Sequence, residues 1–178
     1  MILHSAEEIE RARGNVKKYA WAKQMADEAV AKSQPFVDRT DDELWSLVTG
    51  QQIPRGIHVN PELGCPSCGR RVYEGHGNYP WIPDINKPFK IECPSCGEVW
   101  PKNDFNAFHE SGLGRGGVFD PTLADRSLLV NEEHAGADDP MRGYAVDDGL
   151  GWVDENGERW WFVAFFSHYC TWRELPKA

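Results

Sequence analysis

The sequence lacks both a long hydrophobic run and an excess of positive charge. No stretch approaches the roughly 18 apolar residues that a membrane span needs. Residues 1–30 carry acids and bases where a secretory signal would have an apolar core. Lysine and arginine number 19 against 28 acidic residues, a formal net charge of −9, which disfavours binding to nucleic-acid phosphates. We therefore expect a soluble, cytoplasmic protein without a membrane partner, and we do not expect nucleic acid as a partner.

Cysteine is also scarce, yet four of the five cysteines lie in two copies of one pentapeptide. Residues 65–69 and 93–97 both read Cys-Pro-Ser-Cys-Gly. Each copy, here called a knuckle, places two thiols on a tight turn, and its glycine can adopt the positive φ that turns backbone N–H groups toward the sulfurs. Four thiolates leave a bound metal no open position for water, so we expect a structural rather than a catalytic site. The pattern predicts one Zn²⁺ held by Cys65, Cys68, Cys93 and Cys96.

The two knuckles are further apart than in the common zinc ribbon. Residues 69–92 give a gap of 24 residues, against about 15–20 in the usual pattern. The excess lies in a loop over residues 74–83, and a longer loop costs little because closure entropy grows only logarithmically. Two disulfides or a redox Cys-x-x-Cys are the alternatives; disulfides suit small secreted chains, and a redox motif needs no second copy. We expect His76, in this loop, to stay solvated.

Other residues near the knuckles bear on redox state and charge. Cys170 is left over as an unpaired cysteine, and a thiolate site together with a free thiol indicates a reducing compartment. Four basic residues surround the knuckles, and we expect them to balance the double negative charge of a four-thiolate zinc centre. They are Arg70, Arg71, Lys87 and Lys90.

The N-terminal residues predict helices. Ser5 and Glu8 have the spacing of a capping box, and apolar residues then recur at helical spacing over residues 9–30. Pro35 marks a break soon after the end of this helix. Residues 40–43 repeat the capping-box pattern before a short second helix. The apolar faces of both helices are expected to lie in the core.

The chain divides into a helical segment (residues 1–50), a zinc-ribbon module (51–105) and a loop-rich segment (106–178). Within the ribbon, residues 89–92 alternate as a short strand, and residues 98–100 are its expected partner. The fold class is therefore α+β, mainly helical and loop-rich, with an inserted four-cysteine zinc ribbon.

The last segment combines a long loop with the most apolar run of the chain. Residues 103–151 are rich in Gly, Asp and Pro and predict mostly loop; the glycines of residues 112–117 lack the Gly-Lys-Ser/Thr ending of a phosphate loop. Asn156-Gly157 could turn a hairpin or precede one buried helix over 158–174, and the length of the apolar run favours the helix. Such a helix needs cover on every face, so we expect it to belong inside something larger.

Several motifs follow one another in a characteristic order. After the N-terminal helices come residues 54–60, the two knuckles, residues 100–105, residues 144–152 and an aromatic segment ending in His168, Tyr169 and Trp172. In this order they resemble, over nearly the whole chain, the N-terminal region of heparinase II/III-like proteins, a group of polysaccharide lyases.

The resemblance implies a fold and an activity. Such proteins are several times longer and have an (α/α) toroid followed by a β-sandwich, so residues 158–174 would be the first toroid helix. The chain would be the zinc-stapled N-terminal part of a lyase that β-eliminates uronic-acid-containing polysaccharide, with the poly- or oligosaccharide bound by the full-length protein. In the family the carboxylate neutraliser, base and acid lie on later elements and map onto no position here. The catalytic residues are therefore unknown, and we expect the isolated segment to be inactive.

Local candidates for acid–base chemistry have no visible partner set, so a structural role is favoured for each histidine. The candidates are Asn106, His109, Glu110, His134 beside Glu132 and Glu133, and the neighbours His168 and Tyr169. The acid pairs Asp138-Asp139 and Asp147-Asp148 are expected to be turn and cap residues. Most tryptophans, Trp160 and Trp161 above all, are expected in the core.

The alternative to a lyase part is a freestanding zinc-ribbon module that binds another protein. The two readings differ at the C-terminus, because an interaction module should close its own core, whereas a lyase part should leave the aromatic face of residues 160–172 exposed. An exposed apolar face of this kind predicts self-association through the C-terminal segment.

Overall fold

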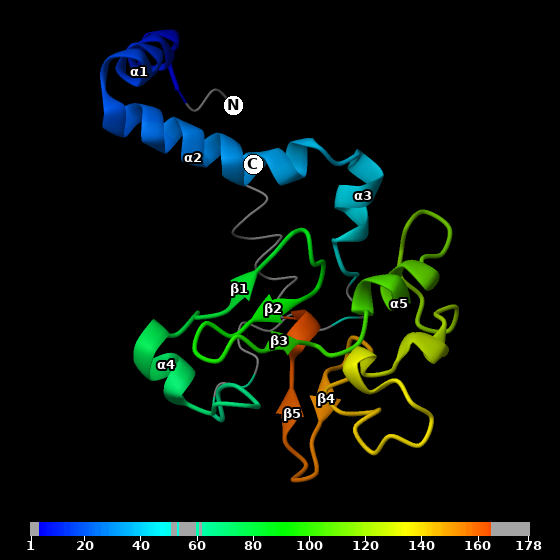
Figure 1. The fold of residues 1–178 in the computed structure, drawn as a ribbon. Coiled ribbons are helices and arrows are strands. Elements are labelled where there is room, and N and C mark those ends of the chain that lie inside the picture. Colours follow the sequence, from blue (N-terminus) through cyan, green and yellow to red (C-terminus); the bar gives the residue numbers. More distant parts are fainter. Residues whose placement is uncertain (1–3, 51–52, 54–59, 61, 165–178) are drawn as a thin grey trace. The chain divides into compact units, whose positions relative to one another are not determined.

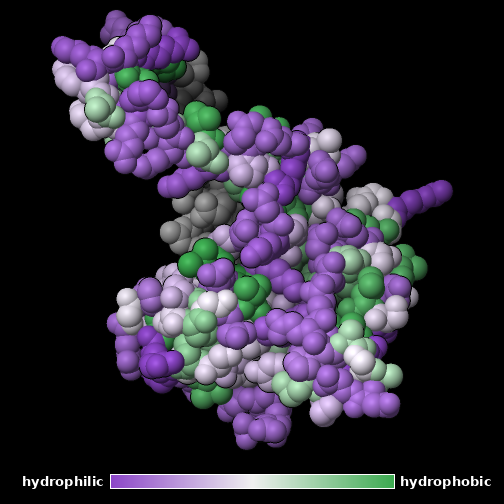
Figure 2. Space-filling model, viewed as in Figure 1, coloured by the Kyte–Doolittle hydropathy of each residue, from purple (hydrophilic) through white to green (hydrophobic). Residues whose placement is uncertain are grey.

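The computed structural model describes residues 4–50, 53, 60 and 62–164. Within them the chain forms two compact units, the helical unit (residues 4–39) and the ribbon unit (residues 40–164). Helices and short antiparallel strands are mixed (Figure 1), so the fold is α+β as predicted. No helix in these ranges is both long and apolar enough to cross a membrane. Hydrophilic residues cover most of the face seen in Figure 2.

The helical unit is a pair of contacting helices, α1 (Ala6–Lys18) and α2 (Ala20–Val37). The predicted capping box starts α1: the Glu8 N–H donates to the Ser5 hydroxyl at 3.2 Å, and the Ser5 N–H donates to the Glu8 carboxylate at 2.8 Å. Tyr19 is extended, with φ −123° and ψ 130°. This break divides the predicted apolar repeat of residues 9–30 between two helices.

The expectation that the apolar faces of this unit lie in the core is wrong. Among the described residues α1 buries none and α2 buries only Ala22. Four large apolar side chains of α2 are between 58% and 68% exposed: Trp21, Met25, Val30 and Val37. Pro35 lies inside α2 instead of beyond its end; in the last turn a missing N–H costs the helix a single hydrogen bond. The capping box of α1 and the helical propensity of both segments, more than burial, define these helices; α2 has no side-chain cap.

The ribbon unit begins with a capped helix and contains a small sheet. In α3 (Asp41–Ser46) the Thr40 hydroxyl accepts the Glu43 N–H, which confirms the second predicted capping box. After α4 (Arg71–His76) three two-residue strands pair antiparallel in the order β1-β2-β3. They are β1 (Ile82–Pro83), β2 (Ile91–Glu92) and β3 (Val99–Trp100). Ile91 pairs with Trp100 and Glu92 with Val99, so the predicted pairing is confirmed.

The segment after the sheet consists mostly of turns, as predicted. Its one α-helix among the described residues is α5 (Phe105–Ser111), where the Asp104 carboxylate accepts the Ala107 N–H at 3.0 Å. In the view of Figure 1, α4 and α5 lie on either side of the three-stranded sheet. Two 3₁₀ turns follow, η1 (Arg126–Leu128) and η2 (Glu132–His134).

A hairpin replaces the start of the helix predicted over residues 158–174. β4 (Trp152–Val153) pairs with β5 (Arg159–Trp160), and residues 162–164 are helical. The Asp154 carboxylate accepts the N–H groups of Asn156 and Glu158, both at 2.9 Å. This local turn chemistry outweighs the length of the apolar run on which the helix prediction depended. Residues 165–174 of that predicted helix lie outside the described residues.

The core of the ribbon unit joins the sheet to the C-terminal hairpin. Trp100 stacks on Phe162, with ring centroids 5.5 Å apart and planes at 12°. Trp160, Phe162 and Val163 are buried, so Trp160 lies in the core as predicted, and Trp161 is half-buried. The described part of the aromatic face that a lyase part should leave exposed is therefore largely buried.

Candidate metal centre

The two knuckles have the same backbone hydrogen bond. The Gly69 N–H donates to the Cys65 carbonyl, and the Gly97 N–H donates to the Cys93 carbonyl, both at 2.8 Å. Both glycines have the predicted positive φ, 64° and 76°. Because an L side chain rarely adopts this conformation, the glycine of each pentapeptide closes the turn that presents its two thiols.

The sulfur atoms of the four cysteines predicted to bind a metal lie close together. All four Sγ atoms fall within 4.8 Å of one another. The Cys65 and Cys96 sulfurs are 3.8 Å apart, and the Cys68 and Cys93 sulfurs are 3.7 Å apart. A tetrahedron with metal–sulfur bonds of about 2.3 Å has edges of about 3.8 Å. The residues therefore fit a four-thiolate metal ion without rearrangement of these two pairs.

The thiols differ in their ease of ionisation. Burial raises the pKa of Cys65, although the N–H groups of Cys68 and Ser67 act in the opposite direction. Burial and hydrogen bonding to the neighbouring thiols raise the pKa of Cys68 to about 11. For Cys93, burial is outweighed by backbone N–H groups, and its pKa is lowered. A metal that binds here must therefore displace protons from Cys65 and Cys68, which makes its affinity depend on pH.

The first knuckle depends on a close backbone approach that no sequence pattern indicates. Gly64 has φ 84°, and a Cβ at this position would lie 2.5 Å from the Gly69 carbonyl oxygen. No other residue type fits here without moving the knuckle. His76 is exposed and does not belong to the cysteine cluster, in agreement with the prediction.

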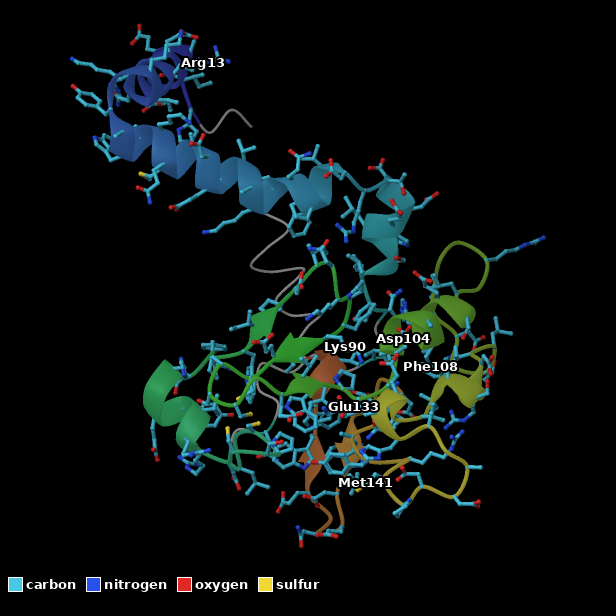
Figure 3. All side chains as sticks on the ribbon, viewed as in Figure 1. Arg13, Lys90, Asp104, Phe108, Glu133 and Met141 are labelled. Carbon is cyan, nitrogen blue, oxygen red and sulfur yellow. The ribbon has the colours of Figure 1, made fainter. Side chains whose placement is uncertain are left out.

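Lys90 and Lys102 form hydrogen bonds and ion pairs that connect the sheet to the loop segment. Lys90 Nζ donates to the carbonyls of Pro101 and Asn103 at 2.9 and 2.7 Å and to the Glu132 carboxylate at 3.0 Å. Lys102 Nζ donates to the carboxylates of Glu98 and Glu133. Figure 3 labels Lys90 and Glu133 near the sheet. The expectation that Lys90 balances the charge of the metal centre is therefore wrong, because carbonyl and carboxylate oxygens surround its ammonium group.

His109 is a core residue. Its side chain is 1% exposed, and its ring lies 4.9–5.9 Å, between centroids, from three phenylalanine rings: Phe89, Phe105 and Phe119. Neither ring nitrogen has a hydrogen-bond partner among the described residues. Burial lowers the pKa of His109 to about 4. A buried, neutral imidazole cannot reach a substrate proton, so the structural role favoured by the sequence holds.

Asp147 is the buried carboxylate around which the end of the ribbon unit is organised. It accepts the N–H groups of Gly149 at 2.7 Å, Gly151 at 2.9 Å and Val163 at 3.1 Å. The side-chain amide of Asn103 makes two hydrogen bonds to the Asp147 backbone: its N–H donates to the Asp147 carbonyl, and its oxygen accepts the Asp147 N–H. Burial raises the pKa of Asp147 to about 6, although the three N–H groups oppose this rise. The sequence predicts a turn or cap residue here, but not that its carboxylate also binds the N–H of Val163.

The other candidates do not converge. His134 Nδ1 lies 3.0 Å from the Asp139 carboxylate, which also accepts the Met141 N–H, and Asn106 bonds Glu110 at 3.1 Å. Asp148 accepts the Leu150 N–H, so both acid pairs supply turn residues as predicted. His168, Tyr169 and Cys170 lie outside the described residues. Among the residues that the structure describes, the four-cysteine cluster is the one group of metal-ligating side chains.

Comparison of the sequence with protein-family models, with curated proteins and with solved structures gives no match. The resemblance to heparinase II/III-like proteins therefore stays an expectation from the motifs. The structure shows a cluster of four cysteines that could hold a metal ion.

Proposed function

We propose that Cys65, Cys68, Cys93 and Cys96 bind one Zn²⁺ and that this ion is structural. The observation that carries the proposal is the match between the 3.7 and 3.8 Å sulfur–sulfur distances and a tetrahedral zinc–thiolate site. A set of four soft sulfur ligands disfavours magnesium and calcium, which prefer oxygen, and leaves zinc or iron. Four ligands complete the coordination, so the ion fixes the fold and activates no water.

Metal analysis of the purified protein tests this proposal. We expect one zinc per chain, lost in Cys65→Ser and retained in Cys170→Ser, because the two Cys-Pro-Ser-Cys-Gly copies supply all four ligands. Iron in place of zinc would contradict the identity of the metal, and metal-free protein with five reactive thiols would contradict the site.

We propose, on the order of the sequence motifs, that the chain is the zinc-stapled N-terminal part of a heparinase II/III-like lyase acting on uronic-acid-containing polysaccharide. Residues 158–174 would then lead into the toroid. β-Elimination needs a group that neutralises the uronate and a base and an acid in reach of the sugar. His109 is buried and His134 pairs with Asp139, so in the described residues these histidines supply no such set. Catalysis would belong to other parts of a longer protein.

One observation supports the second candidate, a zinc-ribbon module that binds another protein. Trp160, Phe162 and Val163 are buried within the ribbon unit, and a self-contained module should close its core in this way. Self-association through the C-terminal segment stays a prediction for either candidate.

An elimination assay distinguishes the two candidates. Residues 1–178 should give no unsaturated uronate product from heparan or alginate, as followed by ultraviolet absorbance. If the reading frame continues into helical repeats, the extended protein should give product. Product from residues 1–178 that disappears in His109→Ala would overturn the assignment of catalysis to other parts, whereas an inactive extended protein would favour the interaction module.

A further inference from the structure

The ribbon unit contains a pocket beside the first knuckle. It has a volume of about 560 Å³ and lies between the first knuckle, residues 140–144 and the β4–β5 hairpin. Met141, labelled in Figure 3, is one of its wall residues. None of the four cysteines lines it. Its size is typical of a small-molecule site.

Aromatic rings form much of the wall. The Tyr144 and Trp152 rings have centroids 4.7 Å apart and planes at 70°, so they meet nearly at a right angle. Trp160 also lines the pocket and is 4% exposed. Its indole N–H donates to the Asp154 carboxylate at 3.3 Å, which fixes the ring against the hairpin turn. The aromatic wall is therefore held in place by the hairpin.

The charged groups of the pocket are acidic. Asp154 and Glu155 line it, and no lysine, arginine or histidine does so among the residues that the structure describes. Burial acts to raise the pKa of Asp154, but the N–H groups of Glu158 and Trp160 outweigh it and the pKa is lowered. Asp154 therefore carries a negative charge at neutral pH, next to rings whose faces are also electron-rich.

We propose that this pocket binds a small organic cation, a methylated ammonium group. Aromatic faces attract such a cation through the ring quadrupole, and its methyl groups gain from contact with apolar walls. The carboxylates complement its charge and disfavour anions. A uronate would be repelled for the same reason, so this proposal goes beyond the proposed function.

Titration with tetramethylammonium chloride at constant ionic strength tests the proposal on the intact, zinc-loaded chain. The readout is the set of indole N–H resonances in a proton–nitrogen NMR spectrum. Saturable shifts should appear for Trp152 and Trp160, assigned by substitution. The resonances of Trp21 and Trp45 should not move, although both side chains are 58% exposed. Shifts of Trp21 and Trp45 without those of Trp152 and Trp160 would overturn the proposal.

Matched variants separate the pocket from the general field of an acidic protein. Glu155 lines the pocket, whereas Glu158 is exposed on the same turn and does not. Glu155→Gln should weaken binding several-fold and Glu158→Gln should leave it unchanged. Trp152→Leu should weaken it by about tenfold, the upper part of the range for a cation over an aromatic ring. Equal losses in the two glutamate variants would contradict a site at the pocket.

Three further probes test the charge argument. The neutral isostere tert-butanol should bind at least tenfold more weakly than tetramethylammonium. Choline should bind more tightly than phosphocholine, because the phosphate is repelled by Asp154 and Glu155. Equal binding of tert-butanol, or tighter binding of phosphocholine, would overturn the proposal. Neither result would bear on the zinc content or on the elimination assay.

Discussion

The helical unit and the ribbon unit obtain their structure in different ways. α1 and α2 have 13 and 18 residues, and Ala22 is the one buried side chain that they contribute. The strands of the ribbon unit have two residues each, yet Ile91 and Trp100 in them are 1% exposed. Contacts local in sequence define the first unit, whereas contacts distant in sequence define the second. The two units should therefore respond differently to the same perturbation.

Removal of the metal should produce the largest difference in stability between the two units. A four-thiolate zinc contributes on the order of 10 kcal/mol, comparable with the whole stability of a domain. After chelation, hydrogen exchange followed by mass spectrometry should accelerate through residues 62–164 and change little in α1 and α2. Addition of zinc should restore protection. Equal acceleration in both units would show that they fold as one, and no acceleration would show that the ribbon unit does not need the metal.

Substitution of Gly64, next to the first knuckle, should give the next largest effect. Gly64→Ala should destabilise the ribbon unit by about 3 kcal/mol, because positive φ and overpacking both add cost. Gly69→Ala is the matched control: its φ is also positive, but the nearest atom to an added Cβ is 3.9 Å away, so it should cost about 1–2 kcal/mol. Denaturant unfolding measures both. Equal losses would contradict the close approach at Gly64.

Acid should weaken the ribbon unit through His109. Its pKa in the folded protein is about 4, below the ordinary 6.5, so the unfolded chain binds the proton more tightly. The stabilisation is complete above pH 6.5 and is lost as the pH falls toward 4; between pH 7 and pH 5 the loss is about 2 kcal/mol.

His109→Phe keeps the aromatic packing and removes the imidazole that takes up a proton. Between pH 7 and pH 5, the loss in free energy of unfolding should therefore be about 2 kcal/mol smaller for His109→Phe than for the unaltered protein. The comparison with the unaltered protein cancels acid effects on the thiolates. His76→Gln, at an exposed position, should follow the unaltered protein. Parallel pH dependences of His109→Phe and the unaltered protein would contradict a buried, neutral imidazole.

Substitution on the exposed face of α2 should have the smallest effect on stability. Trp21→Ala should change the free energy of unfolding by less than about 0.5 kcal/mol, as is usual for exposed positions. Trp100→Ala in the ribbon core should cost about 3–5 kcal/mol. A large loss in Trp21→Ala would show that the α2 face is covered in solution, for example by a second copy, and sedimentation would detect that association.

The sequence predicts those features that depend on short-range patterns. The sequence predicts the caps at Ser5 and Thr40 and the two knuckles, because capping and metal binding by thiols need particular residues at fixed spacing. Burial is harder to predict: the apolar repeat of residues 9–30 indicates helical structure, but neither the break at Tyr19 nor the exposure of the apolar face. The start of the helix predicted from residue 158 is wrong, because the Asp154 turn competes with an apolar run that has no period; residues 162–164 are helical.

Other features depend on contacts that no local pattern reveals. Asn103 and Asp147 are 44 positions apart and bond through buried groups. The burial of His109 among three phenylalanine rings and the close approach of Gly64 to Gly69 likewise follow from packing. Of the candidate site, the sequence therefore predicts the ligand set, while the structure supplies the contacts that hold it.

X-ray absorption at the zinc edge tests whether the four cysteines bind zinc. We expect a single shell of four sulfur atoms at about 2.3 Å from zinc in the purified protein. A shell with nitrogen or oxygen ligands, or fewer than four sulfurs, would contradict a closed four-thiolate centre at Cys65, Cys68, Cys93 and Cys96.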